Sequence, residues 1–210
     1  MGLIGILFTP YRDWFVNNTP LILLIIFLLL SKNQINQSKK YIIFFLIAYI
    51  TGMITEIIGV NTGLLFGHYQ YSNVFGLKLF GVPLLIGLNW FIIITCAGSF
   101  FNQNLALVQQ KFNINISKKA LIIYEIVGGA IITTFFDIIL EPVAIELNFW
   151  SWENAQVPVS NYICWFLISA ALLGINRYFK MLDRNPFATI LFIIQGSFFL
   201  ILNLLLPYFK

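Results

Sequence analysis

The chain has 210 residues, of which 60% are hydrophobic and only 10% are charged. A soluble domain carries roughly a quarter of charged residues, so this composition excludes an ordinary soluble protein and predicts an integral membrane protein. The formal net charge of +4 comes from lysines and arginines spread over short polar segments. There is therefore no basic patch of the kind that binds nucleic acid.

The apolar runs predict one all-α domain, a polytopic transmembrane bundle of about six spans. An apolar run of about 20 residues crosses a bilayer as a helix, because hydrocarbon tolerates no unpaired backbone groups. Asn17, Asn18 and Pro20 shorten the apolar part of the first run. In chain order, the predicted spans are 14–30, 41–60, 79–101, 120–144, 159–179 and 187–208.

The lysines and arginines between the spans predict the orientation, since such residues accumulate on the cytoplasmic side. Nine follow the first, third and fifth spans: Lys32, Lys39, Lys40, Lys111, Lys118, Lys119, Arg177, Lys180 and Arg184. Three lie on the opposite side: Arg12, Lys78 and Lys210. We therefore expect a bacterial plasma-membrane protein with both termini outside the cytoplasm.

Two polar stretches between spans share one pattern, aromatic-x-aromatic-x-Asn. They are YQYSN at 69–73 and WSWEN at 150–154. An acidic residue lies 13 residues before each, and each is followed by Val-Pro and then, seven residues past the proline, by Trp90 or Trp165. This order predicts an internal repeat of spans two-three and four-five, with its symmetry axis along the membrane normal. Chance is the alternative, because aromatics are common at membrane interfaces.

Three acidic residues within the spans are the candidate catalytic groups: Glu56, Asp137 and Glu141. An ionisable residue in hydrocarbon costs about 2.5–3.5 kcal/mol even on lenient scales, so it normally faces the protein interior. Asp137 and Glu141 are four residues apart and share one helical face. Two such carboxyl groups cannot both ionise cheaply, so one is expected to keep its proton and act as a donor. Pro142 predicts a kink or a helix end at Glu141.

A purely structural role for these acids is the alternative. They would then lock the bundle through hydrogen bonds to Asn89, Asn161 or Thr55. A fourth acid, Glu125, lies near the cytoplasmic end of its span, away from the other three.

The aromatic residues form a second candidate group, after the acids, and are predicted to lie at one face of the membrane. They would form an interfacial belt or, around an apolar cavity, stabilise a cation by about 0.5–2 kcal/mol. Acids and rings around such a cavity suit carbocation chemistry on a lipid. The candidate substrate-binding residues are Tyr69, Tyr71, Asn89, Trp90, Trp150, Trp152, Asn161 and Trp165.

The pattern of residues indicates neither a metal nor a cofactor. His68 is the single histidine, and no second histidine or cysteine lies beside it to complete a metal site. The two glycines of TGLLFG do not follow a phosphate-loop pattern.

Two segments carry a resemblance to a known family: EIIGVNTGLLFGHYQYSNVFGLKLFGVPLLIGLNW at 56–90 and DIILEPVAIELNFWSWENAQVPVSNYICW at 137–165. Over about residues 50–180, the chain resembles the carotenoid biosynthesis membrane proteins, whose members include carotenoid 1',2'-hydratases of the bisanhydrobacterioruberin and gamma-carotene hydratase types. The matching pattern is E-x-x-G-x-x-T/N-G-x-x-F-G-x-Y-x-Y, then G-V-P and N-W, then D-x-x-x-[DE]-P-x-A, W-x-W and V-P-x-x-N-x-x-x-W. Glu141 stands where an aspartate is expected, which lengthens the side chain but keeps the acid.

The resemblance implies a reaction in which water adds across the terminal double bond of an acyclic carotenoid end to give a tertiary alcohol. It needs a proton donor, a cavity that tolerates a tertiary cation, a water and no redox cofactor. We expect Asp137 to be the acid, Glu141 its partner and Glu56 the group that orients water. Tyr69, Trp90, Trp150 and Trp165 are expected to line the cation site.

The expected partners are an acyclic or monocyclic carotenoid, water, membrane lipid and other enzymes of the pathway. Three rival functions remain open. A carotenoid cyclase would share the protonation step, a proton-coupled transporter would use intramembrane acids and repeat symmetry, and a pigment-binding scaffold would catalyse nothing.

Overall fold

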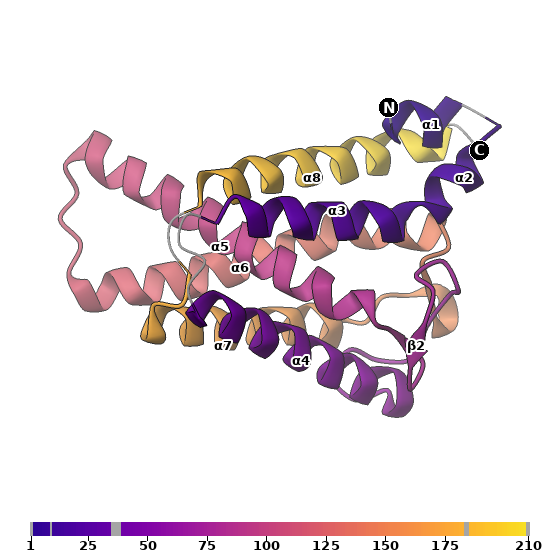
Figure 1. Ribbon diagram of the computed structural model, residues 1–210, viewed down its shortest axis with the longest axis horizontal. Coiled ribbons are helices and arrows are strands. Elements are labelled where there is room, and N and C mark those ends of the chain that lie inside the picture. Colours follow the sequence, from indigo (N-terminus) through magenta and orange to yellow (C-terminus); the bar gives the residue numbers. More distant parts are fainter. Residues whose placement is uncertain (1, 9, 35–38, 183–184, 209–210) are drawn as a thin grey trace.

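The computed structural model describes residues 2–8, 10–34, 39–182 and 185–208, which form an antiparallel helical bundle capped at one end by short strands (Figure 1). Among them, five segments are long and apolar enough to cross a membrane, which confirms the predicted all-α polytopic class. They are α4 (Lys39–Thr62), α5 (Leu85–Phe112), α6 (Lys118–Glu146), α7 (Val159–Phe179) and α8 (Pro186–Leu205) with the 3-10 turn η2 (Leu206–Tyr208).

The predicted first span, 14–30, is wrong as a single helix. The segment is divided between α2 (Arg12–Asn17) and α3 (Thr19–Lys32), with Asn18 between them, and α1 (Gly2–Phe8) precedes both. The 14 residues of α3 extend about 21 Å at 1.5 Å per residue, less than the roughly 30 Å of hydrocarbon. The direction is as expected, because α3 runs from the end that holds the termini to the opposite end (Figure 1).

The third helix begins later than predicted, at Leu85 instead of residue 79. The cause is a small hairpin of β2 (Lys78–Leu79) and β3 (Val82–Pro83), in which Lys78 pairs with Pro83 and Leu79 with Val82. Phe80 and Gly81 both have positive φ, at 47° and 85°, as a two-residue hairpin turn of the I′ type requires.

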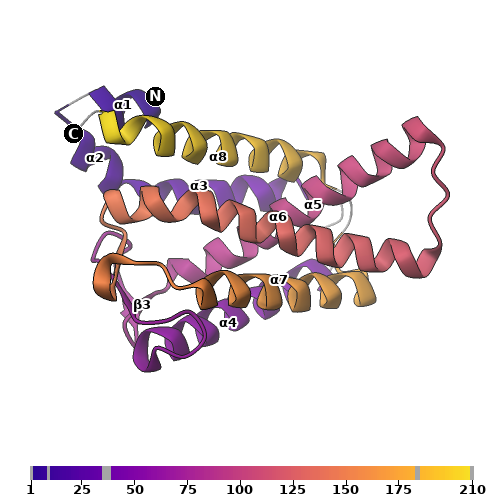
Figure 2. The ribbon, with the colours of Figure 1, turned by 180° about the vertical axis from the view of Figure 1, so that it is seen from behind.

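The fourth helix continues past its proline. Pro142 lies inside α6, which ends only at Glu146, so of the two predicted possibilities the helix end at Glu141 is wrong and the kink stays a prediction. The ends of α5 and α6 project together beyond the other helices (Figures 1 and 2). Ser117 caps α6 by accepting a hydrogen bond from the Ala120 amide at 3.3 Å.

The central helix is α5. Of the residues in its most apolar 18-residue stretch, 67% are buried, compared with 22–33% in the corresponding stretches of the other four spans. Glycines let it approach its neighbours. A Cβ added to Gly129 of α6 would lie 3.8 Å from the Cα of Gly98 in α5, the kind of contact that holds membrane helices together without a hydrophobic driving force.

Helices α3, α5 and α7 all end on the side of the bundle opposite the strands (Figure 1). Their lysines and arginines therefore gather at one end, as the loop assignment assumed. Arg184 and Lys210 lie outside the described residues. Which end faces the cytoplasm stays a prediction.

Candidate active site

The two aromatic frames come together as one antiparallel ribbon. Strand β1 (Tyr69–Tyr71) pairs with β4 (Trp150–Trp152), and in register Tyr69 faces Trp152, Gln70 faces Ser151 and Tyr71 faces Trp150. Successive side chains of a strand point to opposite faces. Gln70 and Ser151 are exposed, whereas the four rings turn toward the bundle.

The ribbon brings its tyrosine hydroxyls within hydrogen-bonding distance of Glu56, a residue of α4 that is only 5% exposed. Its Oε2 accepts hydrogen bonds from the hydroxyls of Tyr69 and of Tyr71, the latter at 2.8 Å, and its Oε1 accepts one from Trp90 Nε1 at 2.9 Å. The indole N–H can only donate. Three donors on two oxygens suit a carboxylate held firmly in place.

Glu141 is bonded in a similar way by the second frame. Its Oε2 accepts from Trp150 Nε1 at 3.0 Å and from Trp152 Nε1 at 2.9 Å. One turn earlier on α6, Asp137 Oδ2 accepts from Asn161 Nδ2 of α7 at 2.8 Å. Within the described residues, Asp137 Oδ1 and Glu141 Oε1 accept no hydrogen bond. Both acids are almost completely buried, with exposures of 2% and 3%.

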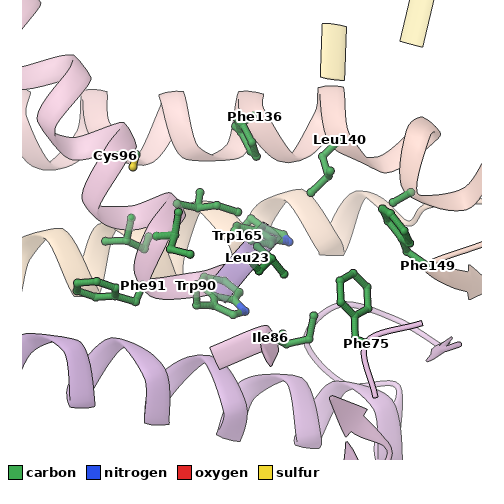
Figure 3. Packing of buried hydrophobic residues seen from close by; sticks show 14 of the residues in the cluster. Leu23, Phe75, Ile86, Trp90, Phe91, Cys96, Phe136, Leu140, Phe149 and Trp165 are labelled. Atoms are coloured by element: carbon green, nitrogen blue, oxygen red, sulfur yellow. The ribbon is translucent and has the colours of Figure 1, made fainter. Parts of the chain in front are cut away.

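All three carboxyl groups line one cavity of about 20 Å³, enough for a single water molecule. Trp90 and Trp165 stack beside it, with ring centroids 4.0 Å apart and an interplanar angle of 9°, and Figure 3 shows the two indoles side by side. The acids are not arranged as a metal-ligand set, since no such group of three His, Cys, Asp or Glu occurs in the described ranges.

The phenols of the ribbon lie outside the membrane-spanning helices. Burial raises the pKa of Tyr69, and the neighbouring Glu56 carboxylate raises it further. The same two causes raise the pKa of Tyr71. Both hydroxyls therefore stay protonated and continue to donate to Glu56 well into the alkaline range.

The cavity brings together all eleven residues predicted from the sequence. They are Glu56, Tyr69, Tyr71, Asn89, Trp90, Asp137, Glu141, Trp150, Trp152, Asn161 and Trp165. Sequence reasoning missed the three apolar residues that complete the lining, Phe66, Ile86 and Leu140. They carry no chemical signal that distinguishes them from the many other apolar residues of the spans.

The fourth intramembrane acid lies elsewhere. Glu125 pairs with Arg177 of α7, and both line a separate cavity toward the opposite end of the bundle. The expected hydrogen bond between an acid and Thr55 is not the one observed, because Thr55 Oγ1 donates to the carbonyl oxygens of Thr51 and Gly52 on its own helix.

Comparison with known proteins gives one match. The family model described as "Carotenoid biosynthesis protein" matches residues 16–206, which is most of the chain. Comparison with curated proteins found no match, and comparison with solved structures found none either.

Proposed function

Because the chain belongs to the carotenoid biosynthesis protein family, we propose that it is a hydratase that adds water across the terminal 1',2' double bond of an acyclic carotenoid end. One observation carries this proposal. Three buried carboxyl groups and seven aromatic side chains line a cavity that is large enough for one water. Proton donor, cation-stabilising rings and a place for water are the requirements of acid-catalysed hydration.

The proton donor is assigned to Asp137. Two charges on adjacent turns of one helix repel strongly in a low dielectric, so Asp137 and Glu141 hold one proton between them. Asn161 occupies Asp137 Oδ2, which leaves Oδ1 to carry that proton toward the cavity. The proton passes to the CH carbon of the terminal double bond, and the adjacent carbon, which bears two methyl groups, becomes a tertiary cation.

Capture of the cation is assigned to water held between the acids. The faces of Trp90 and Trp165 and the ribbon rings stabilise the positive charge until a water oxygen bonds to the cationic carbon. The added water then loses one of its two protons to the Asp137–Glu141 pair, in which both groups are now carboxylates. The acid pair is restored, and the sum is alkene plus water to tertiary alcohol.

Glu56 takes a different role from the one expected from the sequence. All of its hydrogen bonds come from ring donors on three positions, Tyr69, Tyr71 and Trp90. We infer that it is a fixed negative charge that anchors these rings and adds electrostatic stabilisation to the cation. Orientation of the water then falls to Glu141 Oε1 and Asp137 Oδ1.

The polar lining of the cavity favours hydration over cyclisation. A water site needs two to four polar partners, and the lining offers the free oxygens of Asp137 and Glu141 and the amide of Asn89. A cyclase would instead exclude water and enclose a folded polyene end. In either case the lining rings must move apart to admit the substrate, because a polyene end is much larger than about 20 Å³.

The test is expression in a bacterial host that makes acyclic or monocyclic carotenoids, followed by liquid chromatography and mass spectrometry of the pigments. A hydratase gives a new pigment heavier by one water. A pigment isomer of unchanged mass would indicate a cyclase. Unaltered pigments, with the protein present in the membrane and several substrates offered, would favour a transporter or a scaffold.

The proposed orientation, with both termini outside the cytoplasm of a bacterial plasma membrane, has its own test. Asn33 follows α3 at the lysine-rich end of the bundle. In a chain without its native cysteines, Asn33→Cys should not react with a membrane-impermeant thiol reagent in intact cells and should react once the cells are opened. Reaction in intact cells would reverse the orientation.

A further inference from the structure

A second cavity, of about 400 Å³, opens on the opposite side of the bundle core from the ribbon. Four uncharged polar side chains of α5 and α7 line it: Thr95, Ser99, Asn102 and Asn176. Its lining extends along α5 from residue 106 to residue 94, a rise of about 18 Å at 1.5 Å per residue. The upper end is thus one helical turn from Trp90, which lines the acid cavity.

A row of mostly polar residues also runs along α6 between the two cavities. Residues four apart are neighbours on a helix surface, and Glu125, Gly129, Thr133, Asp137 and Glu141 follow one another at this spacing, in a row that winds slowly around the helix. Glu125 lines the second cavity, and Asp137 and Glu141 line the first. This row therefore leads from one cavity to the other.

The facing side of α7 follows the same spacing, with Arg177, Leu173, Ser169 and Trp165. Arg177 forms an ion pair with α6 at the lower end, and Trp165 lines the acid cavity at the upper end. Between them, Leu173 packs closely on two glycines, since a Cβ on either would lie 2.7 Å from a Leu173 methyl carbon. We call these facing residues of α6 and α7, together with Thr95, the polar seam.

Two hydroxyl groups in the polar seam are buried without a protein partner. Thr95 is 2% exposed and Ser169 is fully buried, and neither Thr95 Oγ1 nor Ser169 Oγ makes a hydrogen bond among the described residues. Such groups cost free energy unless water satisfies them. Thr95 lines the second cavity and lies three residues nearer to Trp90 along α5 than Gly98, the residue against which Leu173 packs, and Ser169 lies one turn from Trp165 on α7.

We propose that the polar seam is a water pathway that begins in the second cavity, passes the Thr95 and Ser169 hydroxyls and ends at the Asp137–Glu141 pair. Resting on the proposed function, it supplies the water that hydration consumes. The pathway keeps water away from the side on which the rings close the site. There, Tyr69, Tyr71 and Trp152 form a wall of rings 4.9–5.6 Å apart, and each ring donates a hydrogen bond to a buried carboxylate.

Cysteine labelling tests the pathway without requiring catalysis. Cys96 and Cys164 are first replaced by alanine, and Thr95→Cys, Ser169→Cys and the control Ala97→Cys are made in that background. Ala97 is fully buried on α5 and lines neither cavity. A small, charged methanethiosulfonate reagent needs both water and a thiolate. It should label Thr95→Cys and Ser169→Cys at least about tenfold faster than Ala97→Cys.

Changes at Leu173 then test whether the packing beside Ser169 restricts the pathway. Leu173→Phe should slow the labelling of Ser169→Cys, which lies one turn away on α7, and Leu173→Ala should accelerate it. If Ser169→Cys reacts no faster than Ala97→Cys, even with Leu173→Ala, the pathway does not exist. Labelling as expected in a chain that forms no hydrated pigment would overturn the proposed function and leave the pathway standing.

Discussion

Replacing Asp137 by asparagine separates chemistry from folding at the proposed site. The substitution keeps the size of the side chain, and its amide oxygen still accepts the hydrogen bond that Asn161 Nδ2 now gives to Asp137 Oδ2 over 2.8 Å. An amide has no acidic proton to give. General acid–base catalysis contributes about 10²–10⁴-fold, so hydration should fall by at least about a hundredfold, or about 2.7 kcal/mol at 1.36 kcal/mol per tenfold.

Stability should change much less than activity. A hydrogen bond typically contributes about 0.5–1.5 kcal/mol, and here an acceptor is retained, so the free energy of unfolding should move by about 1 kcal/mol or less. Pigment analysis measures the product, and thermal unfolding of the purified protein measures stability. Glu146→Gln is the matched control, because this residue ends α6 outside the cavity and pairs with Arg12 at 3.7 Å, with about 30% of each side chain exposed.

The reasoning fails if Asp137→Asn produces the hydrated pigment at more than about a tenth of the wild-type rate with equal protein in the membrane. Catalysis would then have another acid as its donor. A matched loss of activity in Glu146→Gln would show that the assay reports expression or insertion rather than chemistry.

Two further predictions concern the groups that hold the site. Burial raises the pKa of Tyr69 and of Tyr71, so their stabilising contribution is complete below the ordinary tyrosine pKa of about 10 and is lost as the pH rises through the higher folded values. Wild type and the Tyr69→Phe/Tyr71→Phe variant should therefore show equal tyrosinate absorbance until unfolding, and extra wild-type absorbance before unfolding would contradict this. Gly52→Ala would place a Cβ 2.5 Å from Trp90 Cγ and should destabilise by about 1–3 kcal/mol, whereas Gly196→Ala, with nothing within 4 Å, should stabilise by up to about 1 kcal/mol. Equal melting temperatures for the two alanine variants would refute the close packing at Trp90.

The sequence predicted the bundle because hydrocarbon permits few alternatives. The span predicted at 159–179 is the helix observed. The break before α3 was less evident, although Asn18 followed by Pro20 in the first turn is a typical helix start. The apolar content of residues 14–30 outweighed that local signal in the prediction.

The strands were missed for a related reason. In a chain this apolar, a polar segment between spans is interpreted as a loop. Yet Tyr-x-Tyr and Trp-x-Trp alternate with the period of a strand, and finding that pattern twice, at 69–71 and 150–152, could have predicted their pairing. The register itself depends on the lengths of the turns and helices that bring the two frames together, which no short motif encodes.

The site residues were predictable because burial of an acid in a membrane is expensive and needs compensation. Each buried acid had to face the interior, and donors had to be near. The partners were not predictable at the level of atoms. Asn161 bonds to Asp137, whereas Asn89 lines the same cavity, and the two amides look equivalent in the sequence.

The register of the ribbon shows where the two halves of the molecule differ. It pairs Tyr69 with Trp152 and Tyr71 with Trp150, so a two-fold rotation centred on Gln70 and Ser151 exchanges the frames. Glu56 and Asp137 precede their frames by the same 13 residues, but one turn further on the first half has Val60 where the second has Glu141.

This difference assigns distinct tasks to the halves. A single acid with three ring donors is suited to hold the rings in place, because both of its oxygens accept hydrogen bonds from them. A pair of acids on adjacent turns keeps only one proton, because two negative charges so close together repel strongly in a low dielectric. That pair can give up a proton and take it back. The doubled acid of the second half, rather than the repeat itself, is therefore what makes the cavity suited to catalysis.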